Sequence, residues 1–237
     1  MARLCINIES VAILRKHADV QGIDPVTVAI LAELGGADGL VCPLAEDLPY
    51  LNQRDLKLLR EMNRTHININ VPPVEAVVNE AVAARPDMLT LVPGKKPGTT
   101  SGGGLDVLGH EAQFGKMIHD LRNQEVIVSL CVDPNIHQVK AAAKLGADYI
   151  ELHMGDYARS ESLRQRNDHL ENIQSIAMAA QKLGLGVAAG RCLNYQNVMP
   201  ISGIPQIEEI NIGRAIISRA LSIGIEAAVR DMLAVVH

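Results

Sequence analysis

Short apolar segments recur along the chain of 237 residues, and helix-like segments lie between them. This alternation is typical of a parallel β-sheet that is covered by helices. The chain contains one Phe, four Tyr and no Trp, so its core must be built from aliphatic side chains, as in other parallel sheets. The predicted strands are Arg3–Ile8, Gly39–Cys42, His66–Asn70, Met88–Val92, Val126–Val132, Tyr149–Leu152, Gly186–Ala189 and Ile207–Ile212.

The joints between helices and strands repeat. Leu34–Gly39 and Leu145–Tyr149 each combine a glycine that ends a helix with an aspartate that begins a strand, and Ala83–Asp87 uses a proline instead. Repeated βα units predict a TIM (β/α)8 barrel, and the absence of a linker predicts a single domain over residues 1–237. A doubly wound open sheet is the alternative, but Asn7–Ser10 lacks its glycine fingerprint. Helices are predicted at Pro25–Leu34, Gln53–Met62, Val74–Ala84, Leu108–Asn123, Asn135–Leu145, Leu163–Leu183, Tyr195–Pro200, Arg214–Leu221 and Ile225–Val236.

Composition argues against several kinds of partner. A net charge of −5 and the scarcity of aromatic side chains disfavour a nucleic-acid surface. No apolar run reaches the roughly 18–20 residues that span a bilayer, so no membrane partner is expected. The chain enters its first strand without a signal-peptide pattern, which favours a cytoplasmic protein. We expect reduced, buried thiols and no disulfide at Cys5, Cys42, Cys131 and Cys192.

Two turns at the ends of late strands predict an anion site. The strand Ile207–Ile212 ends in Gly213, and a helix begins at once with Arg214. The first N–H groups and the dipole of such a helix favour a phosphate, and the glycine lets the ligand approach the main chain. The turn from Ala188 to Arg191, which contains Gly190, has a similar composition. Arginine binds phosphate or carboxylate through two hydrogen bonds, although both arginines could instead pair with surface carboxylates.

A long glycine-rich loop, Pro93–Asp106, follows the fourth predicted strand. Loops at that end of a barrel often act as lids, although plain disorder is the alternative. We favour a lid because several side chains of the loop can donate to phosphate oxygens, namely Lys95, Lys96, Thr100 and Ser101.

Polar side chains near other strand ends are further candidates. Glu151 and His153 share a strand face, so they could act as a base or hold a metal, but a simple hydrogen-bonded pair is the more common arrangement. Asn68 and Asn70 also share a face and could hold a hydroxyl or carbonyl group, or only cap the strand end. Inert packing is the favoured role of Cys42 and Cys192, and a reactive thiol is the alternative. No metal and no cofactor are expected.

Several motifs keep the order and spacing of a known family. They include the Asn7–Arg15, Gly36–Gly39, Gly103–Val107, Ile150–His153, Gly155–Ala158 and Asn211–Ala220 segments. The chain resembles pyridoxine 5′-phosphate synthases, a family of vitamin B6 biosynthesis, over almost its whole length. The resemblance implies a barrel with extra helices and an octameric homo-oligomer. It also implies a transferase-type condensation of 1-deoxy-D-xylulose 5-phosphate with 3-amino-2-oxopropyl phosphate, without a cofactor.

By this resemblance, the acid/base positions of the family are substituted. The catalytic histidine, the general base and the proton-donating histidine of the family fall at Pro43, Asn70 and Arg191. Further family positions fall at Glu9, Ser10, Ala18, Ala45, Tyr50, Cys192 and Arg214. The residues that match are Asn7, Thr100, Ser101, Glu151, Gly190 and Gly213.

The substitutions leave two hypotheses. Proline and asparagine do not exchange protons near neutral pH, and arginine keeps its proton. The chain is therefore expected to be a divergent family enzyme with altered or reduced activity. Glu151 would stabilise charge in the reaction, although a structural ion pair with an arginine is an equal alternative for this residue. The second hypothesis is a non-catalytic barrel that binds a phosphorylated metabolite as a sensor or an inactive subunit.

Overall fold

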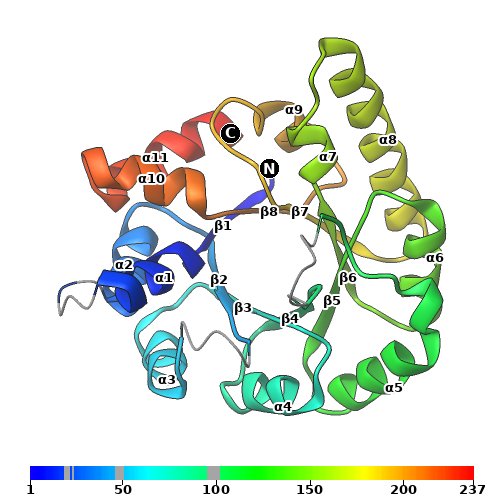
Figure 1. Cartoon of the computed structure of the whole chain (residues 1–237), viewed down its shortest axis with the longest axis horizontal. Coiled ribbons are helices and arrows are strands. Elements are labelled where there is room, and N and C mark those ends of the chain that lie inside the picture. The colour runs from blue at the N-terminus through cyan, green and yellow to red at the C-terminus, as the bar shows by residue number, and fades with distance from the viewer. Residues whose placement is uncertain (19–21, 23, 46–50, 95–101) are drawn as a thin grey trace.

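A computed structural model describes residues 1–18, 22, 24–45, 51–94 and 102–237, without the side chains of 17 and 18. Within these ranges, eight parallel strands pair in sequence order and close into a barrel, because β8 also pairs with β1. Figure 1 shows the strands as a central ring with the helices around it. The predicted TIM barrel is therefore confirmed. The strands are β1 Arg3–Asn7, β2 Gly39–Pro43, β3 His66–Val71, β4 Met88–Leu91, β5 Ile127–Val132, β6 Tyr149–His153, β7 Gly186–Gly190 and β8 Glu209–Ile212.

The helices lie outside the ring and agree with the sequence in most places. The predictions for α2, α3 and α11 match the observed bounds. None of the helices in the described ranges is both long and apolar enough to cross a membrane. The helices are α1 Glu9–Ala18, α2 Pro25–Leu34, α3 Gln53–Met62, α4 Glu75–Ala83, the 3-10 helix η1 Leu108–His110, α5 Glu111–Arg122, α6 Ile136–Lys144, α7 Gly155–Ala158, α8 Leu163–Lys182, α9 Met199–Ser202, α10 Arg214–Ile223 and α11 Ile225–Val236.

Two helix predictions were wrong, and the short α7 at Gly155–Ala158 was not predicted. The segment after β1 was left without a helix, but α1 begins there directly at Glu9 and buries Val11 and Ala12. The helix predicted at Tyr195–Pro200 is replaced by a turn that precedes the short α9. In this turn, the side-chain oxygens of Asn194 and Asn197 accept backbone N–H groups, which competes with helix formation.

The repeated joints have the geometry that the sequence predicted. Gly36 and Gly146 have φ angles of 103° and 83°, in the left-handed region. The carboxylate of Asp38 accepts the N–H of Leu4 at 2.8 Å, and Asp148 accepts that of Val128 at 2.9 Å. Each aspartate thus links the start of its own strand to the strand that precedes it in the barrel.

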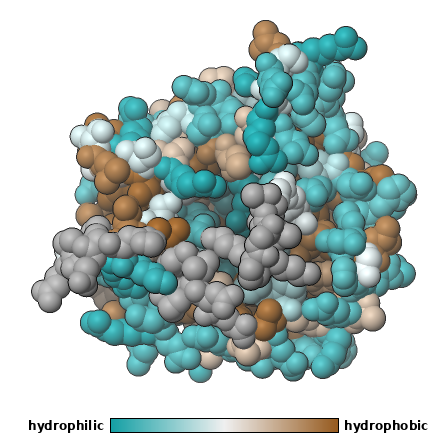
Figure 2. Space-filling model, in the orientation of Figure 1, coloured by the Kyte–Doolittle hydropathy of each residue, from teal (hydrophilic) through white to brown (hydrophobic). Residues whose placement is uncertain are grey.

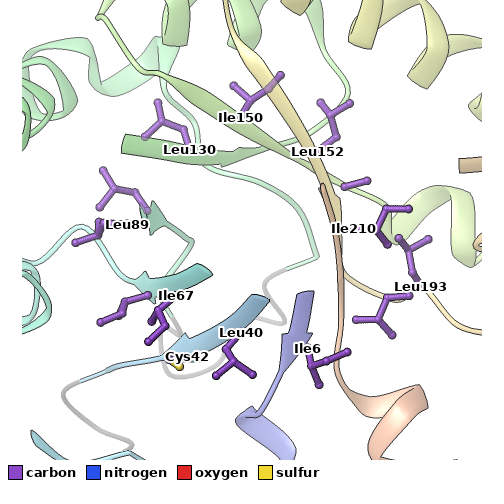
Figure 3. Packing of buried hydrophobic residues seen from close by; sticks show 14 of the residues in the cluster. Ile6, Leu40, Cys42, Ile67, Leu89, Leu130, Ile150, Leu152, Leu193 and Ile210 are labelled. Carbon is purple, nitrogen blue, oxygen red and sulfur yellow. The ribbon is translucent and has the colours of Figure 1, made fainter. Parts of the chain in front are cut away.

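The apolar core lies between the ring of strands and the helices. Figure 3 shows its side chains around the outside of the ring, Ile6, Leu40, Ile150 and Ile210 among them. Strand alternation turns the intervening residues into the barrel, and many of these are polar. The polar or charged residues that are buried on the strands are Asn68, Asn70, Thr90, Ser129, Glu151, Glu209 and Asn211. The interior of the barrel is therefore polar both at its centre and at its mouth.

Figure 2 shows that the face viewed in Figure 1 is mainly hydrophilic, with a group of hydrophobic residues over α10 and α11. Leu221 and Ile223 near the end of α10 are among the exposed hydrophobic residues.

Candidate active site at the barrel mouth

A cavity of about 430 Å³ opens at the carboxyl ends of β1, β3, β6, β7 and β8. Ligand sites of TIM barrels are found at this end. The cavity is lined by many of the residues that the sequence singled out, namely Asn7, Glu9, Ser10, Asn70, Glu151, Arg191, Cys192, Gly213 and Arg214. Residues far apart in the sequence are thus brought to one place.

Glu151 is the buried centre of this cavity wall. Its side chain is 2% exposed and lies within reach of two donors from neighbouring strands or their ends. Arg191 Nε donates to Oε1 at 3.2 Å, and Asn211 Nδ2 donates to Oε2 at 2.6 Å. Burial, assisted by the charge of Glu151, raises the pKa of the Cys131 thiol beside it. Glu151 is therefore a carboxylate that its neighbours hold in one position.

Arg191 and Arg214 both face the cavity. Burial by itself lowers the pKa of Arg191, but the neighbouring groups, Glu151 foremost, together outweigh this effect, so the pKa of Arg191 lies above its ordinary value. Its Nη2 atom is buried and has no hydrogen-bond partner among the described residues. Arg214 is exposed at the first turn of α10 and forms no ion pair with another described residue. The guanidinium of Arg214 therefore remains available to an anion, whereas that of Arg191 is paired with Glu151 and its Nη2 atom is enclosed by the protein.

Gly190 and Gly213 allow close packing within the protein, and the predicted approach of a ligand to the main chain at Gly213 stays a prediction. A Cβ atom on Gly190 would lie 2.8 Å from the Glu151 carboxylate, and one on Gly213 would lie 2.6 Å from the carbonyl oxygen of Asn7. The φ angle of Gly213 is −123°, so its conformation does not require glycine for a positive φ. These glycines make room for a buried side chain and for a neighbouring strand. Gly190 itself is not on the cavity wall.

The turn after β7 contains two strained residues. Arg191 and Cys192 have φ angles of 73° and 60°, which non-glycine residues seldom adopt. The N–H group of Arg191 belongs to the ladder between β7 and β8, in which Gly190 pairs with Asn211. The N–H groups of Cys192 and Leu193 donate to no other described residue. Neither do the N–H groups of Gly213, Arg214 and Ala215 at the start of α10. Two groups of backbone donors thus border one cavity.

Two buried amides of the cavity have an unused oxygen. Asn70 is 4% exposed and Asn211 is 6% exposed, and the Oδ1 atoms of both lack a partner among the described residues. Asn68 lies deeper in the barrel, where its Oδ1 accepts a hydrogen bond from Thr90 Oγ1 at 2.8 Å. Of the two predicted asparagines, only Asn70 lines the cavity.

His153 lies on the β5 side of the mouth. Its Nδ1 accepts the N–H of Gly155 at 3.2 Å and lies 3.9 Å from an oxygen of Asp133. Burial lowers the pKa of His153, and Asp133 opposes this shift in part. No cluster of three metal-ligating side chains occurs within the described ranges.

The cysteines divide into two kinds. Cys5, Cys42 and Cys131 are buried, and Cys42 belongs to the core outside the ring, as expected for an inert thiol. Cys192 is exposed, so the prediction of a buried, packed thiol was wrong there. Strand β7 ends at Gly190, and the turn that follows turns Cys192 outward to the cavity wall.

Some predicted residues cannot be placed. Thr100, Ser101, Lys95 and Lys96 lie outside the described residues, and so does Tyr50. Pro43 ends β2 in register with Asn70, but it is not on the cavity wall. The cavity also includes residues that the sequence did not single out, namely Leu193, Asn194, Asn211, Ile212 and Ala215. Asn211 was detectable because strand alternation places it on the same face as Gly213.

The comparisons with known proteins agree with one another. The family model described as pyridoxal phosphate biosynthesis protein PdxJ matches residues 4–237. Pyridoxine 5′-phosphate synthase from Geotalea daltonii is 43% identical over 233 residues, which cover 98% of each chain. The enzyme of that name from Syntrophobacter fumaroxidans is 40% identical over 237 residues and covers 100% of each chain.

Solved structures with low sequence identity support the fold alone. KGPDC from Streptococcus mutans has a TM-score of 0.66 at 11% identity and covers 100% of this chain and 97% of its own. Thiamine phosphate pyrophosphorylase from Pyrococcus furiosus has a TM-score of 0.62 at 16% identity, with 99% and 95% covered.

Proposed function

Because the chain belongs to the pyridoxine 5′-phosphate synthase family, we propose that it binds a phosphorylated small molecule in the cavity at the barrel mouth. We further propose that its acid/base chemistry is altered or reduced. The observation that carries the first proposal is the set of free donors around this cavity. Arg191 and Arg214 line it, and so do two groups of backbone N–H groups that no described residue uses.

These donors suit a phosphate for a physical reason. A phosphate group accepts several hydrogen bonds at once, and guanidinium groups bind it through charge-assisted bonds. The free N–H groups at the start of α10 add the favourable field of a helix N-terminus. The cavity also contains two carboxylates, that of Glu151, which pairs with Arg191 at 3.2 Å, and that of Glu9.

The second proposal rests on the residues that replace the family's proton-transfer groups. The resemblance assigns those roles to Pro43, Asn70 and Arg191, none of which exchanges a proton near pH 7. Each lost acid or base commonly costs about 10²–10⁴-fold in rate. Glu151 matches a family position, and its carboxylate is held by hydrogen bonds from Arg191 and Asn211.

A non-catalytic role is the second candidate, and the ion pair between Glu151 and Arg191 favours it. In this form, the chain would bind a phosphorylated metabolite as a sensor or as an inactive subunit.

We also propose, from the family resemblance, a homo-oligomer of eight subunits in the cytoplasm. Light scattering of the purified protein would test the number of subunits.

Binding is tested by thermal unfolding in the presence of inorganic phosphate. A ligand at about 100 times its Kd stabilises the folded state by about 2.7 kcal/mol, so the Tm should rise. Arg191→Ala and Arg214→Ala should each reduce this rise. Arg230→Ala is the matched control, because Arg230 pairs with Glu226 on the surface of α11 and lies outside the cavity. No rise in the unmodified protein, or an equal rise in all variants, would contradict the binding site.

Catalysis is tested by incubating the protein with the two family substrates and following the fluorescence of the product. We expect little or no product. Turnover at the rate of a pyridoxine 5′-phosphate synthase measured in parallel would refute the proposed loss of acid/base chemistry and would leave the binding proposal intact.

A further inference from the structure

Cys192 differs from the other three cysteines in its access to solvent. It is exposed on the wall of the mouth cavity, whereas Cys5, Cys42 and Cys131 are buried within the barrel or its core. Burial raises the pKa of each of these three thiols and keeps it protonated. A reagent dissolved in water can therefore reach Cys192 and not the other three while the protein is folded.

A separate observation shows that the cavity beside Cys192 is built for a ligand. The Oδ1 atoms of Asn70 and Asn211 belong to side chains that are more than nine-tenths buried, and neither atom has a partner among the described residues. Leaving a buried acceptor unpaired is costly, so a ligand with hydroxyl or amine donors would stabilise both amides. Such a ligand would occupy the space that the thiol borders.

Hydrogen bonds to backbone carbonyls hold the turn that carries Cys192. The carbonyl oxygen of Cys192 accepts a hydrogen bond from Asn197 Nδ2 at 3.2 Å, and the carbonyl of Asn197 accepts one from Tyr157 at 2.9 Å. Tyr157 is itself buried. The turn is therefore anchored to α7, which keeps the backbone of Cys192 at the cavity wall.

We propose that Cys192 is a site of reversible modification by small disulfides, and that the attached group blocks the cavity against anions. This inference rests on the proposed function. The Cys192 thiolate attacks one sulfur of a disulfide, a new S–S bond forms and the original S–S bond breaks. The released thiolate takes up the proton that Cys192 gave up, so atoms and electrons balance.

The blocking effect follows from the position of the adduct. The N–H groups of Cys192 and Leu193 are among the donors that would hold a phosphate. A peptide-sized group on Cys192 Sγ would lie against these donors and exclude the ligand by its volume. Reduction of the mixed disulfide would restore access.

The experiment uses glutathione disulfide as the probe. The folded protein is treated with it, the four cysteines are mapped by mass spectrometry, and the rise in Tm with phosphate is measured. We expect addition at Cys192 alone, loss of the phosphate-induced rise in Tm, and its return after treatment with dithiothreitol. Saturating phosphate should slow the addition. Addition at a buried cysteine, no addition, or an unchanged phosphate response after addition at Cys192 would each overturn the proposal.

Two variants test whether the effect depends on a thiol at position 192 or on any exposed thiol. Cys192→Ser should take up no glutathione, and its phosphate response should be the same before and after treatment. Ser175→Cys, made in the Cys192→Ser background, places an exposed thiol on α8. This variant should be modified but should keep its phosphate response. Untreated protein without a phosphate response contradicts the proposed function, whereas a response that survives modification at Cys192 contradicts only the present inference.

Discussion

Glu151 and the residues around it decide how Arg191 is oriented at the mouth. The absence of a side chain at Gly190 lets the carboxylate lie against β7, where Arg191 Nε reaches it from the following residue. Asn211 on β8 occupies the second oxygen. Because Nε is engaged, the Nη2 end of Arg191 is left without a partner among the residues that the structure describes. One buried carboxylate thus organises donors from two strand ends.

The backbone at Cys192 leads to a prediction at this scale. A left-handed conformation costs a non-glycine residue about 1–2 kcal/mol, whereas glycine adopts it freely but loses more entropy on folding. Cys192→Gly should therefore raise the free energy of unfolding by about 0.5 kcal/mol, measured by urea denaturation. Glu125→Gly is the matched control, because Glu125 is exposed and also has a φ of 60°. If Glu125→Gly stabilises the protein but Cys192→Gly destabilises it, the contacts of the cysteine side chain stabilise the fold by more than the backbone strain costs.

At the scale of elements, the barrel is built from joints that repeat between a helix and the next strand. In these joints an aspartate side chain accepts a backbone N–H of a neighbouring strand, as Asp38 does for Leu4 and Asp148 for Val128. Asp87 forms the same bond with Ile67 at 2.9 Å. These bonds set the register at the amino ends of the strands, and the register then determines which residues reach the mouth.

Asp38→Ala tests the contribution of one joint. The N–H of Leu4, which is buried, would lose its partner, so the free energy of unfolding should fall by about 1–3 kcal/mol. Asp120→Ala on the exposed face of α5 is the control and should change stability by less than about 0.5 kcal/mol. Equal effects of the two substitutions in urea denaturation would mean that the joint does not stabilise the barrel.

At the scale of the whole molecule, titratable groups are buried at both ends of the barrel. His66 and Glu209 lie at the amino ends of their strands, with His66 Nε2 3.8 Å from Glu209 Oε2. His153 lies near the mouth. Burial lowers the pKa of both histidines, and it raises the pKa of the thiols of Cys5, Cys42 and Cys131. The folded state therefore disfavours protonated histidine and disfavours thiolate.

These shifts predict a maximum of stability near neutral pH. In the unfolded chain, histidine titrates near pH 6.5 and cysteine near 8.5. Below about pH 6.5 the unfolded state binds more protons than the folded state, so stability should fall as the pH falls. Above about pH 8.5 the unfolded thiols lose protons that the folded thiols keep, so stability should fall as the pH rises.

Urea denaturation at pH values from about 5 to 10 measures this profile. His66→Asn and His153→Asn should each flatten its acid side, and His119→Gln, on the exposed face of α5, should leave the profile unchanged. A flat profile between pH 5 and 7 would contradict the prediction for the histidines.

The sequence by itself determined the barrel and most of its elements, because hydrophobic alternation and helix-ending glycines are local signals. It predicted α2, α3 and α11 to the residue, and it placed Glu151 and Asn70 on the inner face of their strands. It missed α1, which begins at Glu9 directly after β1 and buries Val11 and Ala12 against the finished barrel.

Only the tertiary structure decided which side chains contact one another at the mouth of the barrel. Glu151 meets Arg191, 40 residues away, and Asn211, 60 residues away, so neither partner follows from spacing. The need for glycine at 190 and 213 likewise comes from neighbouring strands, and the exposure of Cys192 comes from a strained turn. These features depend on which strand ends closure of the barrel brings together, and that is a property of long-range packing rather than of any local pattern.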